Sequence, residues 1–401
     1  MKKNKQVQET EQSPDYIGTK EFSELPKTER WLWEAVPKKH ERIPLFAKIT
    51  FALSVLCLII YIIAIINTEF ADFFNSTIGV GVRFIAAKIS GIFPFSIAEF
   101  FLISIFPAAV GYIIYAIKKR SFTWKMVASV LSVPVSVALL VFCMFVMTLG
   151  TGYRTPTLDT KLEFKETAVT EENLQQTAEY LVDNINKLSE EMNYGTDSFS
   201  KMPYSFSEMN KKLLSAYDSF AEDYDVLTTY KSKLKPVLLS EPMSYMHTLG
   251  IYTFFTGEAN ININFPDYTI PYTSAHELAH QRGIAREDEA NMIAFLVCME
   301  SDDAYIRYSA YLNMYEYVAN ALYQTNPEAY REVNSKLNAK TRAEQISYSQ
   351  FFNQYRNSGA SKVSSAVNDT FLKVQGTEGE ISYNLVVELT VAYFKTENII
   401  D

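Results

Sequence analysis

Three long apolar runs dominate the first 150 positions of the chain. Residues 49–66 and 100–117 each contain 18 consecutive uncharged positions, and residues 126–149 extend this pattern to 24. A helix of such length crosses a hydrocarbon core of about 30 Å, whereas a helix in a soluble core normally keeps one polar face. The pattern therefore predicts a membrane domain over residues 49–149 with three transmembrane helices.

Basic residues flank these runs unevenly, and such residues stay on the cytoplasmic side of a membrane. They are Lys38, Lys39, Arg42 and Lys48 before the first run, and Lys118, Lys119, Arg120 and Lys125 between the second and third. With three spans, this arrangement predicts a cytoplasmic N-terminal tail over 1–48. It also predicts a large extracytoplasmic domain over 150–401.

The segment 77–98 is also apolar, but Arg83, Lys88, Gly91 and Pro94 interrupt it. Charged side chains and helix-breaking residues are tolerated within the hydrocarbon core only where protein or water covers them. We interpret the segment as interfacial or re-entrant, and not as a fourth span. A fourth span would move the large domain to the cytoplasmic side.

Charge and cysteine content exclude two classes of function. After position 149 the chain has 21 basic and 35 acidic residues, so it lacks the basic stripe that a nucleic-acid-binding protein needs. Cys57, Cys143 and Cys298 are far apart, offer no CxxC pair and lie in apolar stretches. They are expected to be small buried side chains without redox or nucleophilic roles.

The second part of the chain is predicted to be mainly helical. Apolar residues recur at spacings of three and four within 171–193, 205–232, 302–325, 340–357 and 378–395. The clearest strand signals are 251–255 and 261–265, separated by a turn-like stretch that contains Gly257 and Asn260. The fold class is thus mainly α: three transmembrane helices followed by a helical α+β domain with one short β-hairpin.

The sequence His276-Glu277-Leu278-Ala279-His280 follows this hairpin. Histidines four positions apart on a helix project from one face, where both rings can bind one Zn²⁺ ion. Glu277 lies next to the first histidine and is expected to act as general base toward a zinc-activated water. Two of the four histidines in the chain fall in this motif, which disfavours the alternative of two incidental surface histidines.

A third ligand is expected shortly after the motif. Gly283 can end the first helix in a left-handed conformation, and a second helix is expected from about Ala285 to Met299. Glu287, Ala290 and Asn291 resemble the ExxA[D/N] arrangement that carries the glutamate ligand of several membrane gluzincins, so the resemblance implies Glu287 as the ligand. Its rivals are Asp288 and Glu289, and all three could simply be acids favoured at a helix N-terminus. Asn291, one turn later, is a candidate partner for a metal ligand.

The stretch from Tyr252 to Asn264 and the following HELAHQRGIAREDEAN resemble the DUF3810 family of bacterial membrane proteins, a zincin-like group of unknown function. This resemblance implies a zincin-like fold in the bacterial cell membrane. It implies that His276, His280 and an acid within 286–289 bind the metal and that Glu277 is the base. The chain departs from other gluzincins because that acid follows His280 by only seven residues. It departs from metzincins because Arg286 occupies the place of their third ligand.

Other candidates concern the substrate. In zincins an edge strand beside the metal pairs with extended substrate, and residues 257–265 are placed to be that strand, the alternative being a purely structural hairpin. Glu258 and Asn260, within it, are candidate substrate-binding residues. Donors for a developing oxyanion could come from His247, Tyr272, Arg286 or Tyr383, although no spacing favours any of them.

Together these patterns predict a membrane-anchored zinc metallopeptidase, gluzincin-like, that acts on a peptide or protein substrate beside the lipid bilayer. A zinc-binding sensor with the same fold but no hydrolytic activity is the alternative. A transporter is disfavoured because Glu99, at the end of a span, is the only acidic residue near one.

Overall fold

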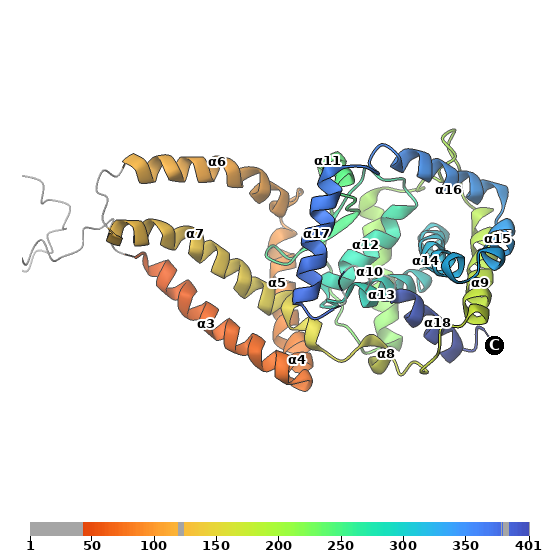
Figure 1. The fold of residues 1–401 in the computed structure, drawn as a ribbon, viewed down its shortest axis with the longest axis horizontal. Coiled ribbons are helices and arrows are strands. Elements are labelled where there is room, and N and C mark those ends of the chain that lie inside the picture. Colours follow the sequence, from red (N-terminus) through yellow and green to blue (C-terminus); the bar gives the residue numbers. More distant parts are fainter. Residues whose placement is uncertain (1–42, 119–123, 378, 380–384, 401) are drawn as a thin grey trace, which may run out of the picture. The chain divides into compact units, whose positions relative to one another are not determined.

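The computed structural model describes residues 43–118, 124–377, 379 and 385–400. This part of the chain is mainly helical, as predicted (Figure 1). Most of the predicted tail over 1–48 lies outside the described residues. So does Tyr383.

Three helices are long and apolar enough to cross a membrane, which confirms the prediction of membrane association. They are α3 (Leu45–Ile66), α6 (Ile97–Lys118) and α7 (Trp124–Phe145), the last continued by the π-helix η4 (Val146–Gly150). Each begins two to four residues before the predicted run. Large apolar side chains such as Phe51, Leu102 and Leu131 are exposed on them, as expected where lipid replaces water.

The segment between the first two spans is a series of short helices. It consists of α4 (Thr68–Phe74), the π-helix η3 (Asn75–Gly79) and α5 (Val80–Ser90). Asn67 caps α4 by accepting a hydrogen bond from the backbone N–H of Phe70 at 2.8 Å. Arg83 and Lys88 interrupt this stretch, and it is not among the helices of the described residues that are long and apolar enough to cross a membrane. The structure therefore agrees with the prediction that this stretch is not a span.

The described chain forms two compact units, each with its own internal contacts. The first holds residues 43–56 and 105–143 with the gap noted above, and within it the hydroxyl of Tyr112 donates to the carbonyl of Val130 at 2.7 Å. The second holds residues 57–104 together with residues 144–400. The segment between the first two spans thus belongs to the same unit as the domain that carries the motif.

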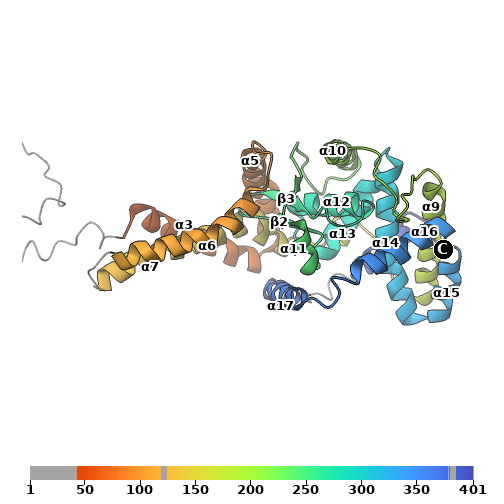
Figure 2. The ribbon, with the colours of Figure 1, turned by 90° about the horizontal axis from the view of Figure 1, so that it is seen from above.

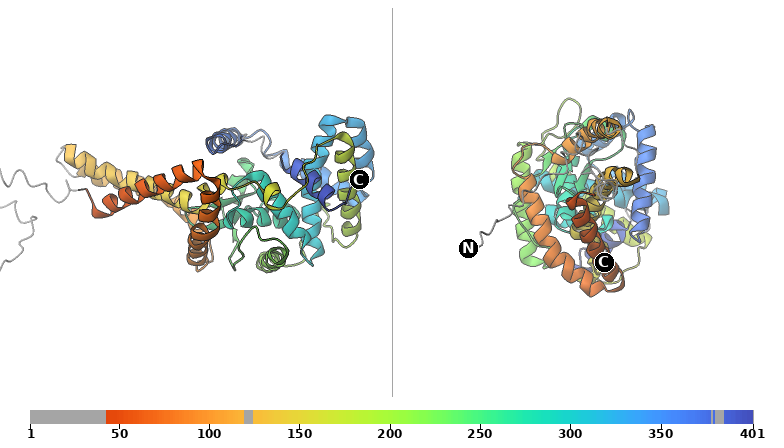
Figure 3. Two further views of the ribbon diagram at one scale, coloured as in Figure 1. Left: turned by 90° about the horizontal axis from the view of Figure 1, so that it is seen from below. Right: turned by 90° about the vertical axis from the view of Figure 1, so that its left-hand side faces the viewer.

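Helices make up most of the second unit. Its core lies among α9 (Glu171–Ser189), α10 (Phe206–Asp223), α12 (Thr269–Gln281), α13 (Glu287–Met299), α14 (Ala304–Thr325) and α18 (Val386–Thr396). Fully buried side chains such as Leu181, Phe295 and Phe394 fill the space between them. The C-terminal end of the chain lies beside α9 (Figures 2 and 3).

Shorter helices complete this unit. They are η5 (Gly152–Arg154), α8 (Leu158–Lys161), α11 (Ser240–Tyr245), α15 (Pro327–Ser335), α16 (Ala339–Phe352) and α17 (Gly359–Val374). Side-chain caps set several starts, because Thr170, Ser205 and Asp303 each accept a hydrogen bond from a backbone N–H of the first turn of the helix that follows. The sequence contains these cap residues, so the helices that follow them begin within two residues of the predicted starts. In contrast, α18 begins eight residues after the predicted start at 378, and α10 ends nine residues before the predicted end at 232.

A small sheet lies against α12 (Figure 2). Its strands are β1 (Lys235–Pro236), β2 (Gly250–Thr253) and β3 (Glu258–Ile261), in the order β1-β3-β2. The predicted hairpin is present as β2 and β3, and its turn is closed by Gly257 in a left-handed conformation at φ 70°. Strand β3 begins three residues earlier than predicted and pairs with β1 in parallel, so it is the middle strand.

Candidate metal centre

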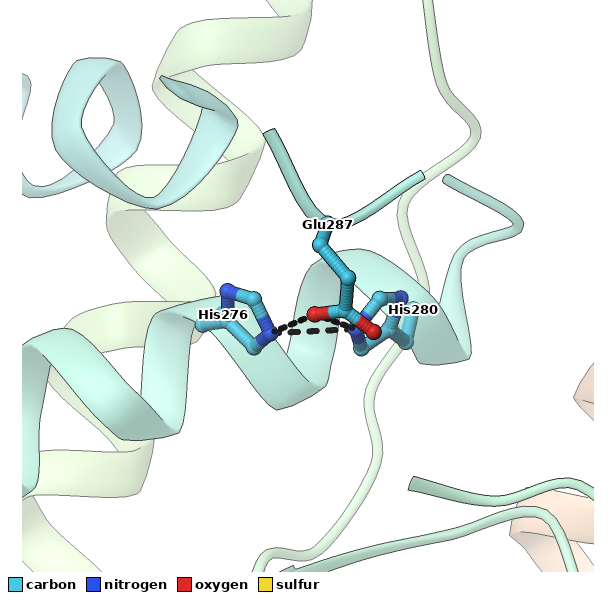
Figure 4. A group of neighbouring side chains, drawn as sticks. All are labelled: His276, His280 and Glu287. Carbon is cyan, nitrogen blue, oxygen red and sulfur yellow. Dashed lines mark hydrogen bonds and ion pairs between the residues drawn. The ribbon is translucent and has the colours of Figure 1, made fainter. Parts of the chain in front are cut away.

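The two histidines of the motif lie on α12, one turn apart, and the chain reverses directly after them. Arg282 follows the last residue of α12, and Gly283 adopts φ 101°, the left-handed conformation expected of it. The next helix, α13, then begins at Glu287. This tight reversal brings the first residue of α13 over the histidines of α12 (Figure 4).

Three side chains converge at this point. The Nε2 atoms of His276 and His280 lie 3.0 Å apart, and Oε2 of Glu287 lies 3.2 Å from the first and 3.5 Å from the second. Tetrahedral zinc, with bonds of about 2.0 to 2.1 Å, places its ligand atoms about 3.3 Å from one another. The nitrogen, nitrogen and oxygen donors thus fit zinc in both chemistry and spacing. Three protein ligands also leave a fourth position open, as in catalytic and not structural zinc sites.

The orientation of His280 is set by the turn itself. Its Nδ1 lies 2.8 Å from the carbonyl oxygen of Ile284, so this nitrogen carries the proton and Nε2 is left to face the site. The Nδ1 of His276 is buried and has no hydrogen-bond partner among the described residues. The reversal after α12 therefore determines the position of Glu287 and the ring orientation of one histidine.

The charged side chains of the site change one another's pKa values. Burial favours the neutral form of Glu287, but His280 and His276 outweigh it and hold the pKa of this carboxyl far below its usual range. Burial likewise lowers the pKa of His280, and the Glu287 carboxylate reverses this and raises it to about 9. The three side chains thus create a buried position that attracts positive charge.

Glu277 occupies the space between α12 and β2. It is 4% exposed, and a Cβ atom at Gly250 would lie 2.6 Å from its Oε1. Its Oε2 has no hydrogen-bond partner among the described residues. Burial raises the pKa of Glu277, against the lowering effect of His276, His280 and the backbone N–H of Tyr252. A carboxylate with a free buried oxygen and a raised pKa beside the ligands is suited to accept a proton.

The two rival acids face elsewhere. Glu289 accepts hydrogen bonds from Arg286 at 2.7 Å and from the backbone N–H of Leu158 at 3.0 Å. Burial, followed by the nearby Glu289, raises the pKa of Asp288 to about 7. Within the described residues, the cluster of potential ligand atoms lying within 4.8 Å of one another contains Glu287 and neither rival.

Arg286 and Asn291 have hydrogen-bond partners that connect the ligand helix to its neighbours. The guanidinium of Arg286 donates to the carbonyls of Tyr153 at 3.2 Å and Thr155 at 2.9 Å, besides its ion pair with Glu289. The hydroxyl of Tyr272 donates to the backbone carbonyl of Asn291 at 3.1 Å. Arg286 and Tyr272 are thus engaged in structural contacts.

Glu258 and Asn260 have structural roles as well. The carboxylate of Glu258 accepts from the backbone N–H groups of Ile97 at 3.0 Å and Ala98 at 2.9 Å, and so caps α6. The Nδ2 of Asn260 donates to Oγ1 of Thr253 at 3.0 Å, within the hairpin.

The expectation that residues 257–265 form the edge strand for substrate is wrong, because β3 lies between β1 and β2. The strand at the sheet edge beside Glu277 is β2. His247, another candidate, adopts φ 58° in a loop, and its Nε2 pairs with the carbonyl of Tyr355 at 2.9 Å.

Two residues near the site were not expected from the sequence. Tyr317, on α14, is partly buried and close enough to Glu287 for this carboxylate to raise the pKa of the phenol, after the larger effects of burial and Glu316. Gly250 is the second. With 26 tyrosines and 14 glycines present, only the fold singles these two out.

Comparison with known proteins gives one family. The family model described as "Protein of unknown function (DUF3810)" matches residues 74–391. No curated protein and no solved structure matches the chain. The match covers most of the chain, from the end of α4 through the metal centre and most of α18. The chain therefore belongs to the DUF3810 family.

Proposed function

We propose that this protein is a membrane-anchored zinc metallopeptidase. The observation that carries the proposal is the convergence of His276, His280 and Glu287 at the spacing of zinc ligands, with the free oxygen of Glu277 buried beside them. A structural zinc site would use four protein ligands and would need no unpaired carboxylate next to it. Zinc, when bound, would supply a Lewis acid that polarises a carbonyl and makes water more acidic.

Glu277 carries the proton transfers in this proposal. Because burial raises its pKa, the Glu277 carboxylate binds a proton more tightly than an exposed glutamate does. It therefore takes a proton from the attacking water. The same carboxyl then delivers the proton to the amine that leaves as the peptide bond breaks. The contact with Gly250 holds the side chain in place on the sheet side, and burial excludes competing water.

Strand β2 is suited to bind an extended peptide. The backbone N–H of Asn262 donates to the carbonyl of Leu249 at 2.8 Å, so alternate residues from Leu249 onward turn their backbone groups toward β3. Gly250 and Tyr252 then turn theirs toward the other side of the strand, where the N–H of Tyr252 faces the carboxylate of Glu277. A substrate strand added at this edge would run past Glu277, which favours peptides over compact substrates.

Tyr317 is the phenol that we assign as hydrogen-bond donor to the oxyanion that forms during peptide hydrolysis. Burial keeps it protonated, and it lies near Glu287 on the side formed by α14. In this proposal Tyr317 supplies the oxyanion donor.

The basic flanks of the apolar helices support an outer location for the catalytic domain, in a bacterial cell membrane. A thiol-reactive, membrane-impermeant reagent tests this in whole cells. Cysteine introduced at the exposed Glu328 should react, and cysteine introduced at Lys3 should react only after lysis. The reverse pattern would place the domain inside.

The enzyme proposal is tested on purified full-length protein in detergent. The wild type is expected to hold about one zinc per chain and to cleave members of a peptide library. Glu277→Gln should keep the zinc and lose turnover, whereas His280→Ala should lose both. Equal turnover by wild type and Glu277→Gln would refute the mechanism, and a wild type that takes up no zinc would refute the site.

A zinc-dependent sensor is the second candidate. It is favoured by one observation: the turn between His280 and Glu287 packs against residues of the segment that joins the first two spans. Stable zinc binding by wild type, without turnover of any peptide pool, would support this candidate over the peptidase.

A further inference from the structure

Arg83 is a buried arginine in α5, with none of its surface exposed. Its Nη1 donates to Oδ1 of Asn75 and to the carbonyl of Thr148, both at 2.8 Å, and its Nη2 donates to the carbonyl of Asn75 at 2.7 Å. A buried cation without a carboxylate partner is costly unless oxygen atoms surround it. The three contacts join the segment between the first two spans to the end of the third.

This cluster lies directly against the turn that follows the histidines. The Nδ2 of Asn75 donates to the carbonyl of Gly283 at 3.1 Å, and this bond is buried. A Cβ atom at Gly283 would lie 2.5 Å from Cζ of Arg83, so only glycine leaves room for the guanidinium there. The turn therefore packs against the guanidinium of Arg83 and is held in place by the hydrogen bond from Asn75.

The opposite side of the turn is enclosed as well. A Cβ atom at Gly152 would lie 2.8 Å from the carbonyl oxygen of Gly283 and 2.9 Å from Cβ of Ala285. Arg286, the residue after Ala285, donates to the carbonyls of Tyr153 and Thr155. Segments next to the first and third spans thus hold the turn between them.

The turn has direct consequences for the metal ligands. It connects His280 to Glu287, and its Ile284 carbonyl orients the His280 ring. Metal bonds tolerate deviations of about 0.2 Å, so a small shift of the turn would misplace Glu287 and rotate His280. Residues that fix outer contacts of metal ligands typically change metal affinity by about 10- to 100-fold when mutated.

We propose that Arg83 and Asn75 are positioning residues of the metal centre, so that the segment linking the first two membrane helices forms part of the metal site. The inference rests on the proposed zinc site. It implies that the C-terminal domain, separated from residues 75–83, would bind metal weakly. It also implies that movement of this segment alters the affinity for metal.

The test compares variants of the full-length protein in detergent, and its readouts are the affinity for Zn²⁺, measured by chelator competition, and the visible spectrum after loading with Co²⁺. Arg83→Gln removes the guanidinium. Asn75→Asp keeps the acceptor for Arg83, replaces the donor to Gly283 with a carboxylate oxygen and adds a negative charge next to the guanidinium. The matched control is Lys235→Gln, because Lys235 is a buried cation of the same unit that donates to the carbonyl of Ser90 at 3.0 Å and does not touch the turn.

We expect both Arg83→Gln and Asn75→Asp to weaken Zn²⁺ binding by about tenfold or more and to alter the Co²⁺ spectrum. Lys235→Gln should keep the wild-type values. If Arg83→Gln does not fold, Asn75→Asp alone decides, because it is nearly isosteric. Unchanged affinity and spectrum in a folded Asn75→Asp protein would overturn the inference and leave the peptidase proposal intact. A wild type that binds no metal would instead overturn both.

Discussion

Gly250 lies so close to Glu277 that a Cβ atom at position 250 would come within 2.6 Å of Oε1 and 2.7 Å of Cγ of that side chain. The glycine is needed here for close approach and not for an unusual backbone angle, since its φ is not in the left-handed region. The edge strand and the proposed general base are thus in direct contact. Any side chain at position 250 must displace one of them.

Gly250→Ala should therefore reduce peptide turnover by about tenfold or more while zinc content stays at the wild-type level, because Glu277 moves and the ligands do not. Turnover and elemental analysis on the same samples measure this. Gly359→Ala is the control, since a Cβ atom there meets nothing within 4 Å. Loss of zinc together with turnover in Gly250→Ala would mean that the strand supports the ligands as well.

Substitutions of the acids at the start of α13 should show which of them is the metal ligand. Glu287→Ala is expected to lower the affinity for Zn²⁺ by about 100-fold or more, because it removes one of three ligand atoms and leaves two histidines. Asp288→Asn should leave the affinity almost unchanged. Chelator competition on the two variants measures the difference, and a larger loss in Asp288→Asn would move the ligand to that residue.

Tyr317→Phe removes a single hydroxyl and tests the oxyanion donor. If the hydroxyl binds only the transition state, kcat should fall by about 100-fold with KM nearly unchanged, and zinc content should be preserved. Tyr323→Phe, on the same helix and 52% exposed, is the matched control and should behave as wild type. A rise in KM at constant kcat would assign Tyr317 to substrate binding in the ground state.

Local patterns allowed much of this structure to be predicted. The three apolar helices follow from uninterrupted runs, and the reversal that brings Glu287 over the histidines follows from Gly283 and the acids behind it. Each of these signals is contained within about 25 consecutive residues. The spacing of His276 and His280 fixes their common face in the same way.

Features that depend on distant segments could not be predicted. Strand β1 has only two residues and no strand pattern, yet its pairing makes β3 the middle strand and leaves β2 as the edge. In the sequence Glu258 is simply a polar residue of the hairpin, and its role as the cap of α6 is visible only in the folded structure. Arg83 interrupts an apolar run, and its partner Gly283 lies 200 residues away in the sequence. Such contacts arise only when the chain folds as a whole.

Glu344 provides a test of stability away from the metal centre. It is fully buried, and burial raises the pKa of its carboxyl despite the hydrogen bonds from Tyr308 and Ser200 and the charge of Lys201. Because the folded protein then binds this proton more tightly than the unfolded chain, the stabilisation is complete below the ordinary glutamate pKa of about 4.3 and is lost as the pH rises through the folded-state value. Glu344→Gln carries no such proton, so its melting temperature relative to wild type should increase as the pH is raised from about 4 toward neutral. The exposed Glu222→Gln should show no such trend, and a constant difference between Glu344→Gln and wild type across this range would mean that Glu344 titrates equally in both states.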